Sequence, residues 1–174
     1  MKMETMSKNI VTLISQLAKN NALIELLINN DDSLPLLLDA VNLEAKITDK
    51  IRRDIISPRT DDAKILPYPF EVEATVTDGS FIRVYYNNGD FNENEVIAES
   101  QLHIDIIVAR SLWLMDDGVK PLVRPYEIVS RVISMVGRNS VSPVRVKFSG
   151  YQHLYINTKF DAIRLYADYM SVEK

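Results

Sequence analysis

The chain of 174 residues contains no cysteine, two histidines, five glycines and one tryptophan. The absence of cysteine excludes disulfides, thiolate nucleophiles and cysteine-ligated zinc. The few glycines form neither a Gly-X-Gly-X-X-Gly pattern nor a P-loop, so the common phosphate cradles are missing. No apolar run approaches the ~18 residues of a transmembrane helix, and polar residues interrupt the apolar segment that follows the N-terminus. We therefore expect a soluble protein made in the cytoplasm, with no cofactor and no membrane partner.

An excess of basic residues is also missing. The formal net charge is −4, with 47% hydrophobic and 25% charged residues. Such a composition is typical of a globular chain with a real core. Binding to nucleic acid through phosphate neutralisation is disfavoured, because it needs a basic surface.

The first third of the chain is helical in pattern. Apolar residues recur at spacings of three, four and seven between residues 10 and 28. Ser7 is the expected N-cap, and Asn20-Asn21 divides this stretch into two helices. A further helix is expected over Leu36–Ile51, with Ser33 as its cap.

The period changes to two after the loop at residues 57–62. Alternating runs over Phe70–Val76 and Phe81–Tyr86 flank Asp78-Gly79, which predicts a tight β-hairpin. A polar loop is expected over Asn87–Glu95, exposed to solvent. A long strand from about Val96 to Ala109 follows it.

The second half continues with a turn at residues 116–118 and a helix opened by Arg124-Pro125. An apolar stripe marks one face of this helix, and Gly137 ends it. Strands are expected over Val144–Phe148, around Leu154–Ile156 and over Phe160–Met170.

These elements predict an α+β fold. Its core is a mainly antiparallel sheet with a β-hairpin and a long strand, covered by a helix on one face. Residues 1–56 form an N-terminal helical segment and residues 65–174 the sheet domain, packed as one compact unit. Several strands carry apolar residues on both faces, so the second face needs a cover as well. The N-terminal helices or a neighbouring subunit would supply it.

Candidates for chemistry are few. His103 and Asp105 share one face of the long strand, where a carboxylate could orient a general base. No nucleophile elbow accompanies them, so we favour a structural or interface role for this face and expect no enzyme. An enzyme that uses this pair, or a metal bound by a carboxylate pair, is a third hypothesis beside the two given at the end of this section. The carboxylate pairs lie in loops and match no calcium-loop spacing; they are Asp31-Asp32, Asp61-Asp62 and Asp116-Asp117.

Arginines at seven-residue intervals, Arg124, Arg131 and Arg138, lie near one face of the predicted helix. This stripe would suit an acidic neighbour or DNA. The simpler interpretation is a solvated face opposite the apolar stripe. The tyrosines in and beside the strands suit an interface, but they are also good strand formers.

The strand Leu102–Ala109, the Arg124-Pro125-Tyr126-Glu127-Ile128 helix start and the strands from Val144 and Phe160 resemble phage tail-terminator and tail-completion proteins. The resemblance covers roughly the second half of the chain. It implies a small subunit without catalytic residues that forms a ring, often a hexamer. Such a ring ends the tail tube and joins it to the head connector. The implied location is the neck or tail of a virion.

On this hypothesis the partners are other copies of the chain, the tail tube protein and the neck or connector proteins. DNA passes through the ring without sequence-specific recognition. The alternative is a small soluble binding or regulatory protein that acts through a protein–protein surface. The exposed polar segments predict the interface residues. They are Asn88, Asp90, Asn92, Glu93, Asp116, Asp117, Lys120, Arg124, Arg131 and Arg138.

Overall fold

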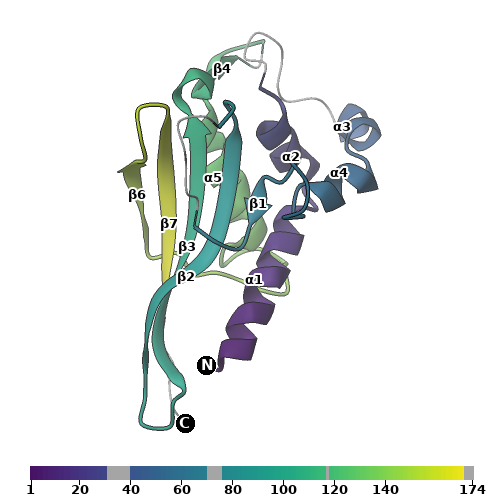
Figure 1. Ribbon diagram of the computed structural model, residues 1–174. Helices are drawn as coiled ribbons and strands as arrows, with labels where there is room; N and C mark the ends of the chain where they lie inside the picture. The colour runs from purple at the N-terminus through teal and green to yellow at the C-terminus, as the bar shows by residue number, and fades with distance from the viewer. Residues whose placement is uncertain (31–39, 70–75, 117, 171–174) are drawn as a thin grey trace.

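The computed structural model describes residues 1–30, 40–69, 76–116 and 118–170. A five-stranded sheet forms its centre, in the order β1-β2-β3-β7-β6. β1 is parallel to β2, and the remaining neighbours are antiparallel. The α+β class with a mainly antiparallel sheet is therefore confirmed (Figure 1). The strands are β1 Ile65–Leu66, β2 Ser80–Phe91, β3 Ile97–Ala109, β6 Gly150–Tyr155 and β7 Phe160–Met170.

The helices are α1 Met3–Leu17, α2 Asn21–Ile28, α3 Ala40–Lys46, α4 Asp49–Asp54 and α5 Arg124–Val136. A 3-10 turn, Arg110–Leu112, follows β3 and leads into a small two-stranded ribbon. The ribbon consists of β4 Leu114–Asp116 and β5 Pro121–Val123. Gly118, with φ of 86°, occupies the turn between them, and its N–H donates to Asp116 Oδ1.

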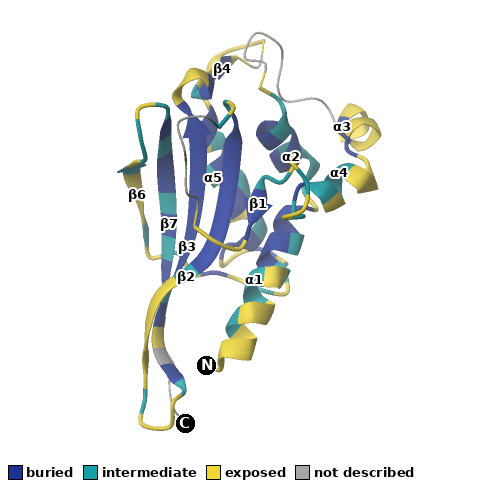
Figure 2. Cartoon of the chain, in the orientation of Figure 1, coloured by how far each residue is buried: buried dark blue, intermediate teal, exposed yellow. Residues whose placement is uncertain are grey.

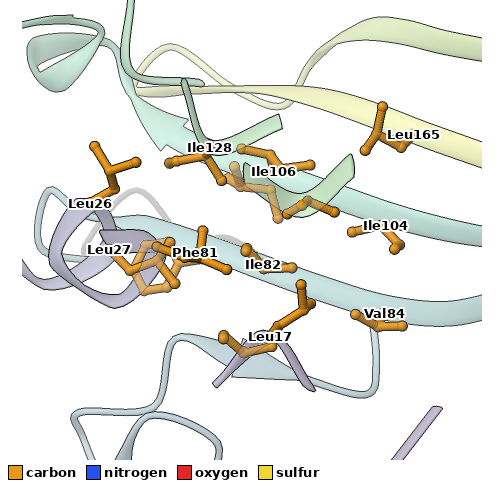
Figure 3. Packing of buried hydrophobic residues seen from close by; sticks show 14 of the residues in the cluster. Leu17, Leu26, Leu27, Phe81, Ile82, Val84, Ile104, Ile106, Ile128 and Leu165 are labelled. Atoms are coloured by element: carbon orange, nitrogen blue, oxygen red, sulfur yellow. The ribbon is translucent and has the colours of Figure 1, made fainter. Parts of the chain in front are cut away.

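Helices α1, α2 and α5 pack together over one face of the sheet (Figure 1). The strand residues that face these helices occur at every second position, because successive side chains of a strand point to opposite faces. Ile82 and Val84 of β2 lie opposite Ile106 and Ile104 of β3, and all four are fully buried. Figure 3 shows these side chains meeting those from the helices, such as Leu17. One hydrophobic cluster thus joins the helices to the sheet.

The N-terminal helices depart from the prediction in two places. α1 begins at Met3, with Lys2 as its N-cap, so the expectation that Ser7 caps it was wrong. Asn20 does separate α1 from α2, and its side chain accepts a hydrogen bond from Leu23 N at 2.9 Å. The single helix expected over Leu36–Ile51 is broken near Thr48, which caps α4 instead. Ser33 and the start of that expected helix lie outside the described residues.

The predicted hairpin is placed differently in the structure. β2 pairs with β3 along its length, and β1 occupies its other edge at Ile82 and Arg83. The Asp78-Gly79 step makes no tight turn, because Gly79 has no positive φ and its carbonyl accepts from Ala109 N at 3.0 Å. Most of the expected first strand, Phe70–Val76, lies outside the described residues.

The expected loop over Asn87–Glu95 is largely strand. β2 continues to Phe91, and β3 begins at Ile97, so only residues 92–96 turn. The two strands project beyond the helices and the rest of the sheet (Figure 1). We call this projecting part, residues 87–99, the hairpin arm. Figure 2 shows that it is mostly exposed, in contrast to the buried half of the same strands.

Two further differences concern the second half of the chain. The strand expected over Val144–Phe148 is reduced to one parallel bridge between Val146 and Gly137. The N-terminal helices share the face covered by α5, so they do not cover the second face of the sheet. There, Lys64 lies over the Phe81 ring and the Arg83 guanidinium over the Tyr68 ring. β3, α5 and β7 lie where the sequence predicts them.

Candidate functional surfaces

The second face of the sheet carries three cross-strand rows of side chains. The first row is apolar, with Phe81 beside Ile107 and Ala162. The next row contains a buried ionic network around Asp105, which lies between Arg83 on β2 and Arg164 on β7. The third row is aromatic, with Tyr85, His103 and Tyr166 side by side. An ionic row and an aromatic row thus follow an apolar row along the same three strands.

Asp105 is tied to two neighbours. Arg164 donates from Nε to Asp105 Oδ1 at 2.7 Å and from Nη2 to Oδ2 at 2.9 Å. The Tyr85 hydroxyl donates to Asp105 Oδ2 at 2.7 Å and accepts from Arg164 Nη2 at 2.9 Å. Burial and the adjacent carboxylate raise the pKa of Tyr85, which keeps the phenol protonated at neutral pH. The network is a closed set of charge-assisted hydrogen bonds that holds β2, β3 and β7 together.

His103 does not join this network. Its Nε2 lies 2.6 Å from Gln101 Oε1, and its ring meets Tyr85 edge-on at 5.5 Å between centroids. Burial lowers the pKa of His103, with a smaller effect of the Arg164 charge, so the neutral ring is favoured. The shared face of His103 and Asp105 is confirmed, but the dyad that would orient a base is not formed. Arg164 and Tyr85 occupy the Asp105 carboxylate instead.

The carboxylate pairs give no metal centre in the described part of the chain. No group of three or more histidines, aspartates or glutamates is close enough there to hold an ion. Asp61 and Asp62 are exposed in a loop, and Asp116 closes the β4–β5 turn. Asp31-Asp32 and Asp117 lie outside the described residues.

The prediction of an accessible arginine stripe on α5 is wrong for its first member, Arg124. Arg124 is fully buried and donates to three backbone carbonyls: Leu112 O at 2.9 Å, Leu26 O at 3.1 Å and Asn29 O at 2.6 Å. It therefore links the end of α2 to the 3-10 turn and is not available to a partner. Arg131 is half-buried and Arg138 is exposed, so both are accessible on α5 and just beyond it. Lys120 is exposed in the β4–β5 turn.

The other predicted interface residues lie on the hairpin arm. Asn88 and Asp90 are exposed on β2, and Glu93 is exposed at the turn. Asn92 shapes that turn, because its Oδ1 accepts from the backbone N–H groups of Asn94 and Val96, each at 3.0 Å. The structure thus brings four of the ten predicted residues together on one projecting element. It places the β4–β5 turn and the Arg131–Arg138 face elsewhere.

The strands of the arm approach each other closely. A Cβ atom on Gly89 would lie 2.7 Å from the Glu99 carbonyl oxygen, so glycine fits here and a larger residue would push the strands apart. Asp90 lies directly opposite Glu99, which sets two carboxylates side by side. Both line a hollow of about 360 Å³ with Ser100 and Asp168. The arm is therefore a negatively charged surface.

Two residues escaped the sequence reasoning. Arg164 completes the Asp105 network from a strand 59 residues away, and only the register between β3 and β7 brings them together. Phe91 is 60% exposed near the tip of the arm, although aromatic residues are usually buried. An isolated aromatic residue within a polar, acidic segment was the signal available for Phe91.

No helix in the described ranges has both the length and the apolar character needed to cross a membrane. A search of curated proteins and a search of solved structures gave no match. The YomW family matches residues 20–169, a range that includes the whole sheet except the last residue of β7 and every helix except α1. The match covers well over half of the sequence, so the chain belongs to the YomW family, whose name indicates a phage origin.

Proposed function

We propose that this protein is a structural subunit of a phage neck or tail, which forms a ring that ends the tail tube and joins it to the head connector. The hairpin arm is the observation that carries the proposal. A two-stranded ribbon is marginally stable in water by itself, so a long projecting ribbon gains most from packing on another molecule. The exposed Phe91 near its tip is the kind of aromatic anchor that protein interfaces bury.

The second face of the sheet does not favour acid–base chemistry. Asp105 is fully used by Arg164 and Tyr85, and His103 is directed to Gln101. The groups that would do acid–base work are thus committed to holding strands together. The phage origin of the family agrees with a virion subunit. It supports the proposal without distinguishing a tail terminator from its neighbours.

The proposal is tested by mass and by tube capping. We expect purified protein to give a closed species near six subunits by light scattering after size exclusion, over a range of concentrations. When it is added to tail tubes polymerised from the tube protein of the same phage, electron microscopy should show a ring at one tube end and arrested growth. A strict monomer that leaves tube length unchanged would contradict the proposal and favour a monomeric binding or regulatory protein.

A further inference from the structure

The charges of this chain are separated along the sequence. Between Arg83 and Arg110 there is no lysine or arginine, and the hairpin arm contains four carboxylates: Asp90, Glu93, Glu95 and Glu99. Between Glu127 and Asp161 there is no aspartate or glutamate. That second stretch carries five basic residues: Arg131, Arg138, Arg145, Lys147 and Lys159. An acidic element and a basic element thus coexist on one subunit.

The fold gathers three of the basic residues at one place. The bridge between Gly137 and Val146 holds the segment after α5 against the end of that helix, and Val146 N donates to Val136 O at 2.7 Å. The backbone positions flanking this bridge are basic on both sides. We call the surface that they form the basic flank; it consists of Arg138, Arg145 and Lys147.

Neither element is neutralised within its own subunit. Among the described residues, no ion pair joins any arm carboxylate or any basic residue of the flank. Arg138, Arg145 and Lys147 are exposed, as are Asp90 and Glu99. Two basic residues outside the flank do form ion pairs within the subunit: Arg110 with Asp161, and Lys159 with Asp78.

The arm also contains an unfavourable pair that a cation would relieve. Asp90 and Glu99 are direct cross-strand partners, and like charges in that position destabilise a ribbon. Both line the hollow of about 360 Å³, which Asp168 borders as well. A guanidinium group entering it would offset the repulsion and form charge-assisted hydrogen bonds.

We infer that the arm of one copy docks on the basic flank of a second copy, with Phe91 as its apolar anchor. The inference rests on the ring of the proposed function and names the two surfaces that join its subunits. Arm and flank are different patches, so the contact can repeat head-to-tail from copy to copy, and such a contact closes into a ring when its rotation permits. Complementary charge also sets the register and suppresses arm-to-arm contact, since like charges repel.

Cysteine trapping tests the contact directly, because the chain has no cysteine of its own and therefore no background. Protein carrying Glu93→Cys is mixed with protein carrying Arg138→Cys under mild oxidation. Both positions are exposed. We expect a disulfide-linked heterodimer in several-fold excess over a control mixture in which Asp61→Cys, in an exposed loop, replaces the arm variant. Trapping should weaken as salt rises, because exposed charges are screened.

Charge reversal provides the second measurement. Asp90→Lys, Glu93→Lys and Glu99→Lys together reverse the arm, because they change its four carboxylates to a net charge of +2, and Arg138→Glu, Arg145→Glu and Lys147→Glu reverse the flank. Each reversed variant should raise the dissociation constant for self-association at least about tenfold, since opposed like charges cost several kcal/mol. A 1:1 mixture of the two should restore assembly, because each arm then meets an opposite charge. Asp61→Lys with Asp62→Lys is the matched control and should leave assembly unchanged.

The outcomes separate this inference from the proposed function. Trapping without a closed ring supports the arm–flank contact and contradicts the ring. A ring that forms with reversed arms and gives no arm–flank disulfide overturns the contact and leaves the ring standing. No trapping above the Asp61→Cys control, together with a monomer, overturns both.

Discussion

The two halves of the β2–β3 hairpin make different use of the same pairing. Near the body, both faces are buried, and residues such as Ile82, Ile106 and Phe81 fill space on each side of the sheet. In the arm, most side chains are exposed, although Ile97 is buried, and asparagines and carboxylates replace most of the aliphatic residues. The body half is specified by the core of its own subunit. On the proposed function, the polar sequence of the arm half serves contacts with other subunits.

The largest effect of a single change is expected in the body half. Ile106 is fully buried between the helices and the sheet, so Ile106→Ala should lower the free energy of unfolding by about 2–5 kcal/mol through lost burial and a cavity. Urea denaturation measures it. Ile133→Ala is the control, because Ile133 is 43% exposed on α5, and it should change stability by less than about 0.5 kcal/mol. Equal losses in both variants would contradict the assignment of the core.

A smaller loss is expected in the ionic network on the second face of the sheet. Asp105→Asn leaves the Arg164 guanidinium without its charge partner, which should cost about 1–3 kcal/mol of unfolding free energy. The cost stays below that of a fully buried pair because the Arg164 side chain is 24% exposed.

Asp161→Asn is the matched control for the network. It breaks the pair between Asp161 on β7 and Arg110 in the 3-10 turn, where the Arg110 side chain is 46% exposed. We expect a loss below about 1 kcal/mol there. If the two variants lose the same stability in thermal unfolding, the Asp105 network contributes no more than a surface pair.

The third effect is a dependence on pH. Burial lowers the pKa of His103 in the folded state, so the unfolded state binds more protons near and below the ordinary value of about 6.5. The contribution of the neutral His103 ring to the free energy of unfolding is fully present above that value. It is lost as pH falls from about 6.5 toward the pKa of His103 in the folded state. We expect His103→Gln to flatten the fall in melting temperature between pH 7.5 and 5.5. Identical profiles for wild type and His103→Gln would contradict this.

The smallest effect on folding is expected at the tip of the arm. Phe91 is 60% exposed, so Phe91→Ser should change the unfolding free energy of dilute, monomeric protein by less than about 0.5 kcal/mol. The same variant should weaken self-association, measured by sedimentation, if the arm is an interface. A large loss of stability in the dilute protein would show that the arm belongs to the subunit's own core.

The sequence predicted well those elements whose signal is local. Pro125 at the start of α5 and Gly137 at its end bracket an apolar stripe, and the structure confirms that helix. The stretch Leu102–Ala109, rich in β-branched residues, likewise predicted a long strand. The Asp78-Gly79 signal failed because a turn is only one use of that dipeptide. The Gly79 carbonyl instead accepts a hydrogen bond from Ala109 at the end of β3. β1 occupies the edge of β2 that the predicted partner strand would need.

The contacts on the second face of the sheet were predicted only in part, and the reason is register. Strand alternation places His103 and Asp105 on one face without further information. Which side chain each of them meets depends on how β7 aligns with β3, and Asp105 opposite Arg164 is fixed by tertiary pairing. The buried Arg124 was missed for a similar reason. Its three acceptors belong to α2, the residue after it and the 3-10 turn, which no helical period can indicate.

The sheet order has a consequence for the order of events during synthesis. β7, Phe160–Met170, lies between β3 and β6, although it is the strand nearest the C-terminal end of the sequence. A nascent chain that has not yet released β7 from the ribosome holds β3 with one edge unpaired and β6 with no partner in the sheet. Native pairing of long sequence separation closes late. On the proposed function, productive contact between copies is therefore expected to follow translation of each chain, which would keep a half-made subunit out of the ring.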